Sequence, residues 1–156
     1  MPELKIRAAT PRDDAELLRM MRQLAEQEPG KIKFDETAAR ASLGKFRSLP
    51  AFGSVWMLCE GNKAVGYIVL TVGFSFEFHG RDAFIDELYV DAAYRRRGHG
   101  RKAVIFIEEK AREMGVNAIH LEVDKGNDAA FELYRRTGYA DHDRFLMTKW
   151  LKREQH

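Results

Sequence analysis

The chain has 156 residues, of which 45% are hydrophobic and 32% are charged, a composition typical of one ordinary globular domain. We therefore expect a single domain over residues 1–156 that needs no disulfide, since its one cysteine, Cys59, has no partner. Lys and Arg number 26 against 24 Asp and Glu, which excludes a protein that coats nucleic acid or an anionic membrane through bulk charge.

Neither a membrane span nor a signal peptide is predicted. No stretch reaches the roughly 18 consecutive apolar residues that cross a bilayer, and residues 1–5 lack an apolar signal-peptide core. A lone cysteine is typical of a reducing compartment, so we expect a cytoplasmic protein.

The first third of the chain predicts one strand and two helices. The strand is expected over residues 4–7, and a capping-box pattern over residues 10–13 starts the first helix. A loop over residues 27–34 then leads to a second helix over residues 35–46.

The middle of the chain has the two-residue period of β-strands. Gly61-Asn62-Lys63 predicts a hairpin turn, and alternating Phe74, Phe76 and Phe78 extend strand character toward a turn at residues 80–82. The strands expected here cover residues 55–60, 64–72 and 83–90.

The last third alternates helices with strands. The expected elements are a helix through residues 104–114, a strand over 118–123, a helix over 128–137 and a strand over 145–151. The helical connection from strand 83–90 to strand 118–123 predicts a parallel pair. The order is therefore β-α-α-β-β-β-α-β-α-β, an α+β fold with a central mixed sheet flanked by helices.

Residues 90–102 carry the strongest chemical signal, because a strand ends there, a basic turn with glycines follows and an apolar helix begins. Five of the eight residues from 95 to 102 are cationic, in a chain whose net charge is only +2. Gly98 and Gly100 let backbone approach an oxygen without a Cβ in the way. The N-terminus of a helix offers free N–H groups and favours an anion. The segment therefore predicts a polyphosphate site.

Other interpretations of these residues exist. The turn is also compatible with a plain solvated bend, and Gly98-x-Gly100-x-x-Ala103 with Glu122 also resembles a dinucleotide fingerprint. A basic segment separates the strand from the first glycine, and antiparallel strands precede the unit, which weakens the dinucleotide reading. His120 and Glu122 have no third His or Cys at metal spacing, so we expect no metal. We interpret Cys59 as a core thiol.

Two motifs resemble a known family. Arg95-x-x-Gly98-x-Gly100, after the strand that ends at Val90, resembles the acyl-CoA pyrophosphate motif of the GNAT superfamily of N-acyltransferases. Residues 127–139 read Asn-x-x-Ala-x-x-x-Tyr-x-x-x-Gly-Tyr and are similar to that family's second signature. With the element order, the resemblance covers residues 5–151.

The resemblance implies that acetyl-CoA is the co-substrate and that its acetyl group passes directly to an amine in a ternary complex. It implies that the Leu88 N–H polarises the thioester carbonyl and that Tyr134 protonates the departing sulfur. The residues implied to hold coenzyme A come from a strand end, the basic turn and a later helix. They are Leu88, Tyr89, Val90, Arg95, Arg96, Arg97, Gly98, His99, Gly100, Arg101, Lys102, Asn127, Ala130 and Tyr134.

The attacking amine must lose a proton, because a free alkylamine has a pKa near 10. Glu122 is the first candidate base: it shares the polar face of strand 118–123 with His120 and matches the place of a glutamate in some family members. Glu87 is the second candidate, or Asp86 beside it, and a β-bulge would decide which of the two faces the site.

The acceptor is expected to be a small cationic amine, such as a diamine, a polyamine or an aminoglycoside-like molecule. The resemblance implies that residues 27–34 and 73–82 set the acceptor, and carboxylates lie in segments expected to border its cleft: Glu77, Asp82, Asp86, Glu87, Glu122 and Asp124. The alternatives are a peptide or protein amine and a non-catalytic acyl-CoA-binding regulatory module. The sequence is also compatible with a homodimer.

Overall fold

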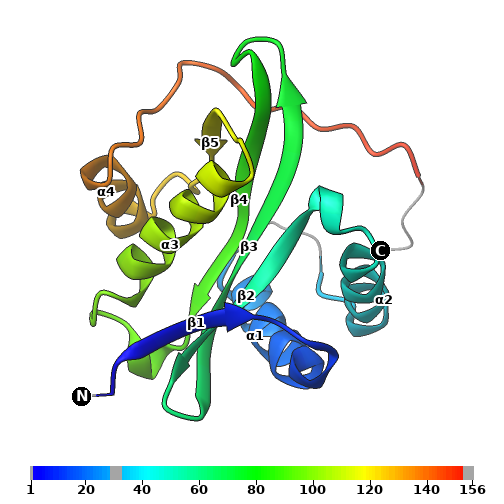
Figure 1. The fold of residues 1–156 in the computed structure, drawn as a ribbon, viewed down its shortest axis with the longest axis vertical. Helices are drawn as coiled ribbons and strands as arrows, with labels where there is room; N and C mark the ends of the chain where they lie inside the picture. The colour runs from blue at the N-terminus through cyan, green and yellow to red at the C-terminus, as the bar shows by residue number, and fades with distance from the viewer. Residues whose placement is uncertain (1, 29–32, 153–156) are drawn as a thin grey trace.

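The computed structural model describes residues 2–28 and 33–152, so part of the expected loop 27–34 lies outside the described residues. A five-stranded sheet in the order β1-β2-β3-β4-β5 forms the centre (Figure 1). Each neighbouring pair from β1 to β4 is antiparallel, and β4 and β5 are parallel, as the helical connection predicted. The strands are β1 Leu4–Ala8, β2 Gly53–Glu60, β3 Lys63–Ser75, β4 Gly80–Val90 and β5 Ala118–His120.

Helices cover both faces of this sheet (Figure 1). One face carries α1 Asp14–Gln27 and α2 Glu36–Arg47, and the other carries α3 His99–Glu113 and α4 Asp128–Arg136. The α+β architecture is therefore confirmed, and the antiparallel strands exclude the parallel sheet of a dinucleotide-binding domain. Within the described residues, no helix is long and apolar enough to cross a membrane.

Strand alternation divides the apolar side chains between two cores, one on each face of the sheet. Tyr67 and Val69 of β3 pack toward α1 and α2, whereas Ile68 and Leu70 pack toward α3. Cys59 is buried in the α1–α2 core, and burial raises the pKa of its thiol. The thiol is therefore held in its protonated, unreactive form, as the interpretation of a core residue requires.

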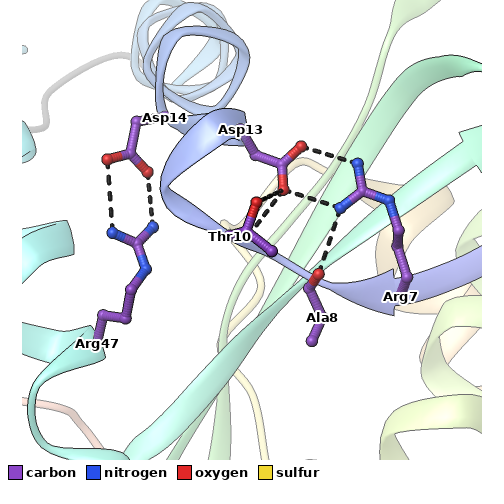
Figure 2. A network of polar contacts seen from close by, with 6 residues as sticks. All are labelled: Arg7, Ala8, Thr10, Asp13, Asp14 and Arg47. Carbon is purple, nitrogen blue, oxygen red and sulfur yellow. Dashed lines mark hydrogen bonds and ion pairs between the residues drawn. The ribbon is translucent and has the colours of Figure 1, made fainter.

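A buried carboxylate fixes the passage from β1 into α1 (Figure 2). Asp13 accepts two bonds from the Arg7 guanidinium, both at 2.8 Å, and one from the backbone N–H of Thr10 at 2.8 Å, which completes the expected capping box. Beside it, Asp14 accepts a bond from Arg47 at 2.6 Å, which joins α1 to the end of α2. The first helix is thereby tied to both the edge strand and the second helix.

The turn between β3 and β4 lies earlier than expected. β3 ends at Ser75, the turn covers residues 76–79, and Gly80 already begins β4, so residues 80–82 are strand and not turn. The physical reason is the Asn117 side chain, whose Nδ2 donates to the carbonyls of Phe78 and His79 at 3.0 and 3.1 Å. That amide lies so close to Gly80 that a Cβ there would be 2.7 Å from Nδ2.

Two other expectations about strands are wrong. The strand expected over 118–123 ends at His120, because β4 bulges just beyond its last residue paired with β5 and offers no further straight edge. The segment expected as a strand over 145–151 forms none, since β5 has only three paired residues to offer it. This segment instead runs past the β3–β4 hairpin toward α2 (Figure 1).

Asp13 should contribute to stability in a pH-dependent way. The Arg7 guanidinium lowers the pKa of this carboxyl to about 2, below its unfolded value of about 3.9. Since the folded pKa is the lower one, the stabilisation is complete above pH ~4 and is lost as the pH falls toward ~2. We expect Asp13→Asn to lower the free energy of unfolding by about 2 kcal/mol at pH 7, and the gap from wild type to close below pH ~4.

Urea unfolding at several pH values would measure this. Glu113→Gln is the matched control, because its exposed pair with Lys110 should contribute well under ~1 kcal/mol at any pH. An Asp13→Asn deficit that stays constant down to pH ~2 would contradict the assignment.

Candidate active site

The outer edge of β4 is open over its second half. β4 pairs with β5 only from Asp82 to Phe84, so no described strand covers that edge of β4 beyond Phe84. Asp91 donates its backbone N–H to Val65 in β3 at 2.8 Å, and backbone groups alternate sides along a strand. The N–H groups of Leu88 and Val90 therefore point away from β3, toward the open edge.

A β-bulge places two consecutive carboxylates on one face of the sheet. Val69 of β3 pairs with Glu87, and the next residue, Leu70, pairs with Ile85, so Asp86 is an extra residue in β4. Regular alternation would send Asp86 and Glu87 to opposite faces, but a bulge shifts the alternation by one residue. Ile85 packs in the α3 core, and both carboxylates line a cavity on the α1–α2 side.

This cavity is large enough for a small molecule, at about 840 Å³. Its walls come from α1, α2, β3 and β4, together with Thr148 and Trp150 of the C-terminal segment. Most of the lining side chains are apolar or aromatic, among them Phe34, Phe46 and Phe52. The charged lining residues are the carboxylates Glu28, Asp35, Asp86 and Glu87 and the lysines Lys33 and Lys45, so acidic groups outnumber basic ones. An elongated molecule with an apolar stem and a cationic end fits such a lining.

The carboxylates expected near an acceptor separate into distinct groups. Glu87 accepts a bond from the buried Tyr67 hydroxyl at 2.8 Å, and burial together with Glu87 raises the pKa of Tyr67. Glu77 forms an ion pair with Arg144, whose guanidinium lowers the pKa of the Glu77 carboxyl. The Asp82 carboxylate lies within hydrogen-bond distance of the His120 ring. Of the six, only Asp86 and Glu87 are among the described residues that line the cavity.

Glu122, the first candidate base, is not brought to this cavity. It is exposed in the segment after β5 and lies outside the cavity lining within the described residues, as does Asp124. The expected polar face depended on a strand that continues to Val123, and the strand ends at His120. Among the described residues, the structure therefore brings Asp86 and Glu87, and not Glu122, to the cavity.

The basic turn has the backbone of an anion site. Arg96 and Gly98 both adopt the left-handed region, with φ of 61° and 80°, on either side of Arg97. Turns of this kind direct successive N–H groups into one concavity. Gly98 is the N-cap of α3 and supplies no side-chain cap, so the first N–H groups of the helix, from His99 onward, face no capping side chain.

The side chains of the turn divide between internal and external roles. Arg95 donates to Val90 O at 2.8 Å and to Gln27 at 3.1 Å, while Arg97 and His99 turn inward to Glu60. All five cations of the turn are exposed, but the side chains of three of them form neither a hydrogen bond nor an ion pair with any described residue; they are Arg96, Arg101 and Lys102. These three are the side chains available to a polyphosphate.

α4 lies beside the start of α3. Leu133 of α4 comes within 3.6 Å of where a Cβ on Gly100 would be. Tyr134 is half-buried against the edge of Tyr139, with ring centroids 5.8 Å apart, and burial raises the pKa of its hydroxyl. Asn127 is the N-cap of α4, because its Oδ1 accepts the N–H of Ala130 at 3.2 Å.

Some residues of this region were not singled out from the sequence. Trp150 and Thr148 line the cavity although their segment was expected to be a strand, and no local pattern predicts that placement. Glu60 has a weak sequence signal, since it is the charged end of an otherwise apolar strand. No cluster of three or more His, Cys, Asp or Glu side chains suited to a metal ion occurs within residues 2–28 and 33–152.

Comparison with known proteins identifies relatives over most of the chain. Residues 18–139 match the model of the Acetyltransferase (GNAT) family. The thialysine N-epsilon-acetyltransferase of Sus scrofa is 32% identical over 152 residues, which cover 90% of this chain and 86% of the relative. The enzyme of the same name from Mus musculus is also 32% identical, with the same coverage.

Solved structures share the fold. An integron cassette protein from the mobile metagenome of Cole Harbour Salt Marsh is 28% identical, with a TM-score of 0.82 over 96% of this chain and 91% of that one. An aminoglycoside acetyltransferase from an uncultured soil metagenomic sample, in complex with sisomicin, is 20% identical, with a TM-score of 0.72 over 96% and 97% of the two chains. With its family match, its relatives and the open edge and basic turn described above, the chain belongs to the GNAT family of N-acetyltransferases.

Proposed function

We propose that the protein transfers the acetyl group of acetyl-CoA to a primary amine of a small cationic molecule, with both substrates bound at once. The observation that carries this proposal is the pair of carboxylates, Asp86 and Glu87, in a mostly apolar cavity at the strand whose other edge is open. Carboxylates attract a protonated amine. The similarity to thialysine N-epsilon-acetyltransferases supports an amine at the end of a short flexible side chain.

Coenzyme A would be held along the open edge and at the basic turn. The outward N–H of Val90 would donate to a pantetheine amide carbonyl, as in a neighbouring strand, and the outward N–H of Leu88 is left for the thioester carbonyl. The N–H groups of the turn and the exposed cations Arg96, Arg101 and Lys102 would hold the pyrophosphate. When bound, acetyl-CoA supplies a thioester carbonyl that an amine can attack.

The reaction needs one group to take a proton and another to give one. The amine nitrogen forms a bond to the acetyl carbon, the carbon–sulfur bond breaks, and the amine loses a proton. We assign that proton to Glu87, directly or through water, with Asp86 holding the cationic end of the acceptor. Leu88 N–H would stabilise the developing oxyanion. Tyr134 would return a proton to the sulfur, and its raised pKa keeps that proton in place until then.

Thiol release from acetyl-CoA, measured with a panel of amines, tests the function. The panel contains thialysine, a linear diamine, sisomicin and a lysine-containing peptide. We expect turnover with thialysine or the diamine to exceed that with the peptide. Turnover with the peptide alone would indicate a protein acetyltransferase, and coenzyme A binding without turnover on any amine would indicate a regulatory module; either result would contradict the proposal.

The cofactor assignment predicts the effect of a charge placed in the turn. Gly100→Glu should weaken coenzyme A binding by well over tenfold, because it sets a negative charge and bulk against the pyrophosphate. Gly100→Ala is the matched control: its Cβ would meet Leu133 at an ordinary 3.6 Å, so we expect a folded protein with nearly normal affinity. Calorimetry would measure the affinity of both variants for coenzyme A. Equal affinities would show that the turn is not part of the binding site.

The acid assignment predicts a loss of turnover without a loss of binding. Tyr134→Phe keeps the ring against Tyr139 but removes the hydroxyl, so kcat should fall by about 10²–10⁴ with the Kd of coenzyme A unchanged. Tyr139→Phe, in the same aromatic pair, should keep kcat within about twofold. Near-normal turnover of Tyr134→Phe would reduce that residue to a packing role.

The base assignment separates the two glutamates. Glu87→Gln should lower kcat and remove the acidic limb of its pH profile, whereas Glu122→Gln should leave both unchanged. Asp86→Asn should mainly raise KM for a cationic acceptor, through lost attraction. Rates against pH with thialysine would measure this, and a collapse of kcat in Glu122→Gln with Glu87→Gln near wild type would restore Glu122 as the base.

A further inference from the structure

Glu60, at the end of β2, is buried beneath the basic turn. Only 8% of this residue is exposed, and it lies on a strand that contributes no residue to the turn. Its Oε1 is 2.5 Å from Nε2 of His99, which is itself 5% exposed, and its Oε2 is 3.3 Å from Nη1 of Arg97. The Glu60 carboxylate therefore contacts both the residue before Gly98 and the residue after it.

We propose that Glu60 is a positioning residue for acetyl-CoA, which fixes the stretch from Arg97 to His99 in the shape that receives the pyrophosphate and does not itself touch the cofactor. This inference rests on the proposed function, since it concerns the same turn. In this proposal the side chains of Glu60, Arg97 and His99 hold the backbone of the turn in place and do not bind phosphate.

The turn needs such an anchor because its own backbone does not fix it. Gly98 adopts φ 80°, and no described atom lies within 4 Å of where its Cβ would be, so neither a side chain nor close packing restrains it. The ring of His99 depends on Glu60 for its orientation, because its buried Nδ1 has no hydrogen-bond partner among the described residues. Glu60 is therefore the contact that orients the His99 side chain at the first residue of α3.

Arg97 extends the anchor to the other side of the turn. Its Nη2 donates to the carbonyl of Ala93 at 3.2 Å, and its Cζ lies 4.9 Å from the centre of the Tyr94 ring. Lys63, which follows the β2–β3 turn, lies over the same ring at 5.0 Å. Through Arg97 and His99, Glu60 thus connects the short 3-10 helix Ala92–Tyr94, which precedes the turn, to the first residue of α3.

The energetics favour a positioning role over a purely stabilising one. Burying a carboxylate is costly, and the attraction to its partners usually returns that cost with little net gain in stability. The bonds from His99 and Arg97 lower the pKa of Glu60, so the carboxylate is ionised at neutral pH. A turn that is already in its binding shape spends less free energy on ordering when the ligand arrives, and this gain appears as affinity.

Two single variants and their combination test the proposal. Glu60→Gln keeps the side-chain shape but removes the charge, and His99→Gln removes the imidazole. We expect each to weaken coenzyme A binding by about tenfold, as the loss of a charged hydrogen bond would. At saturating acetyl-CoA, kcat should stay within about twofold of wild type. The double variant should bind no more than about threefold more weakly than either single one, since the two residues act as a unit.

Asp13→Asn is the matched control, because Asp13 is also a buried carboxylate paired with an arginine but belongs to the β1–α1 junction. It should lower Tm without changing the Kd of coenzyme A. Unchanged Kd in folded Glu60→Gln and His99→Gln would overturn the inference, as would additive effects in the double variant or a loss of kcat at saturation. If the wild-type protein does not bind coenzyme A, both the proposed function and this inference are wrong. If the wild-type protein binds and the variants bind equally well, only this inference is wrong.

Discussion

The extra residue at Asp86 determines how the two halves of the candidate site meet. It shifts the alternation of β4, so that Asp86 and Glu87 both face the α1–α2 cavity while Leu88 returns to the regular pattern beside the open edge. A bulge also bends the strand that contains it. The same irregularity therefore accounts for the paired carboxylates and for the early end of the β4–β5 pairing at Phe84. The edge of β4 would receive the thioester, and its α1–α2 face the amine.

Charged side chains are also distributed differently between the basic turn beyond β4 and the cavity on the α1–α2 face. The turn before α3 keeps Arg96, Arg101 and Lys102 exposed, whereas carboxylates outnumber lysines in the lining of the cavity. Under the proposed function, an anionic cofactor and a cationic acceptor would be attracted to different sides of one strand. Glu60 forms an ion pair with Arg97, so the Arg97 guanidinium adds less free positive charge to the cofactor side than any of the three cations named above.

Local features were readable from the sequence because they depend on neighbours in the chain. The glycines and cations of the basic turn, the capping box at residues 10–13 and the helix over 128–137 are short-range patterns, and the structure has a helix at each predicted place. Features that need a distant partner were not readable. The register of β3 against β4 decides which face Glu87 takes, the length of β5 depends on the edge that β4 offers, and Glu60 meets His99 across 39 positions. The polar face expected to contain Glu122 required a strand that continues to Val123, and β5 ends at His120.

One measurement tests the central claim, that acceptor and cofactor meet at the bulge of β4. It is the crystal structure of the protein with a bisubstrate analogue, in which the sulfur of coenzyme A is linked through an acetyl bridge to the side-chain nitrogen of thialysine. The account predicts the pyrophosphate at residues 96–102, the bridge beside Leu88, and the amino-acid portion in the α1–α2 cavity with its nitrogen near Asp86 and Glu87. An analogue whose amino-acid portion lies instead against Glu122, outside that cavity, would contradict the account.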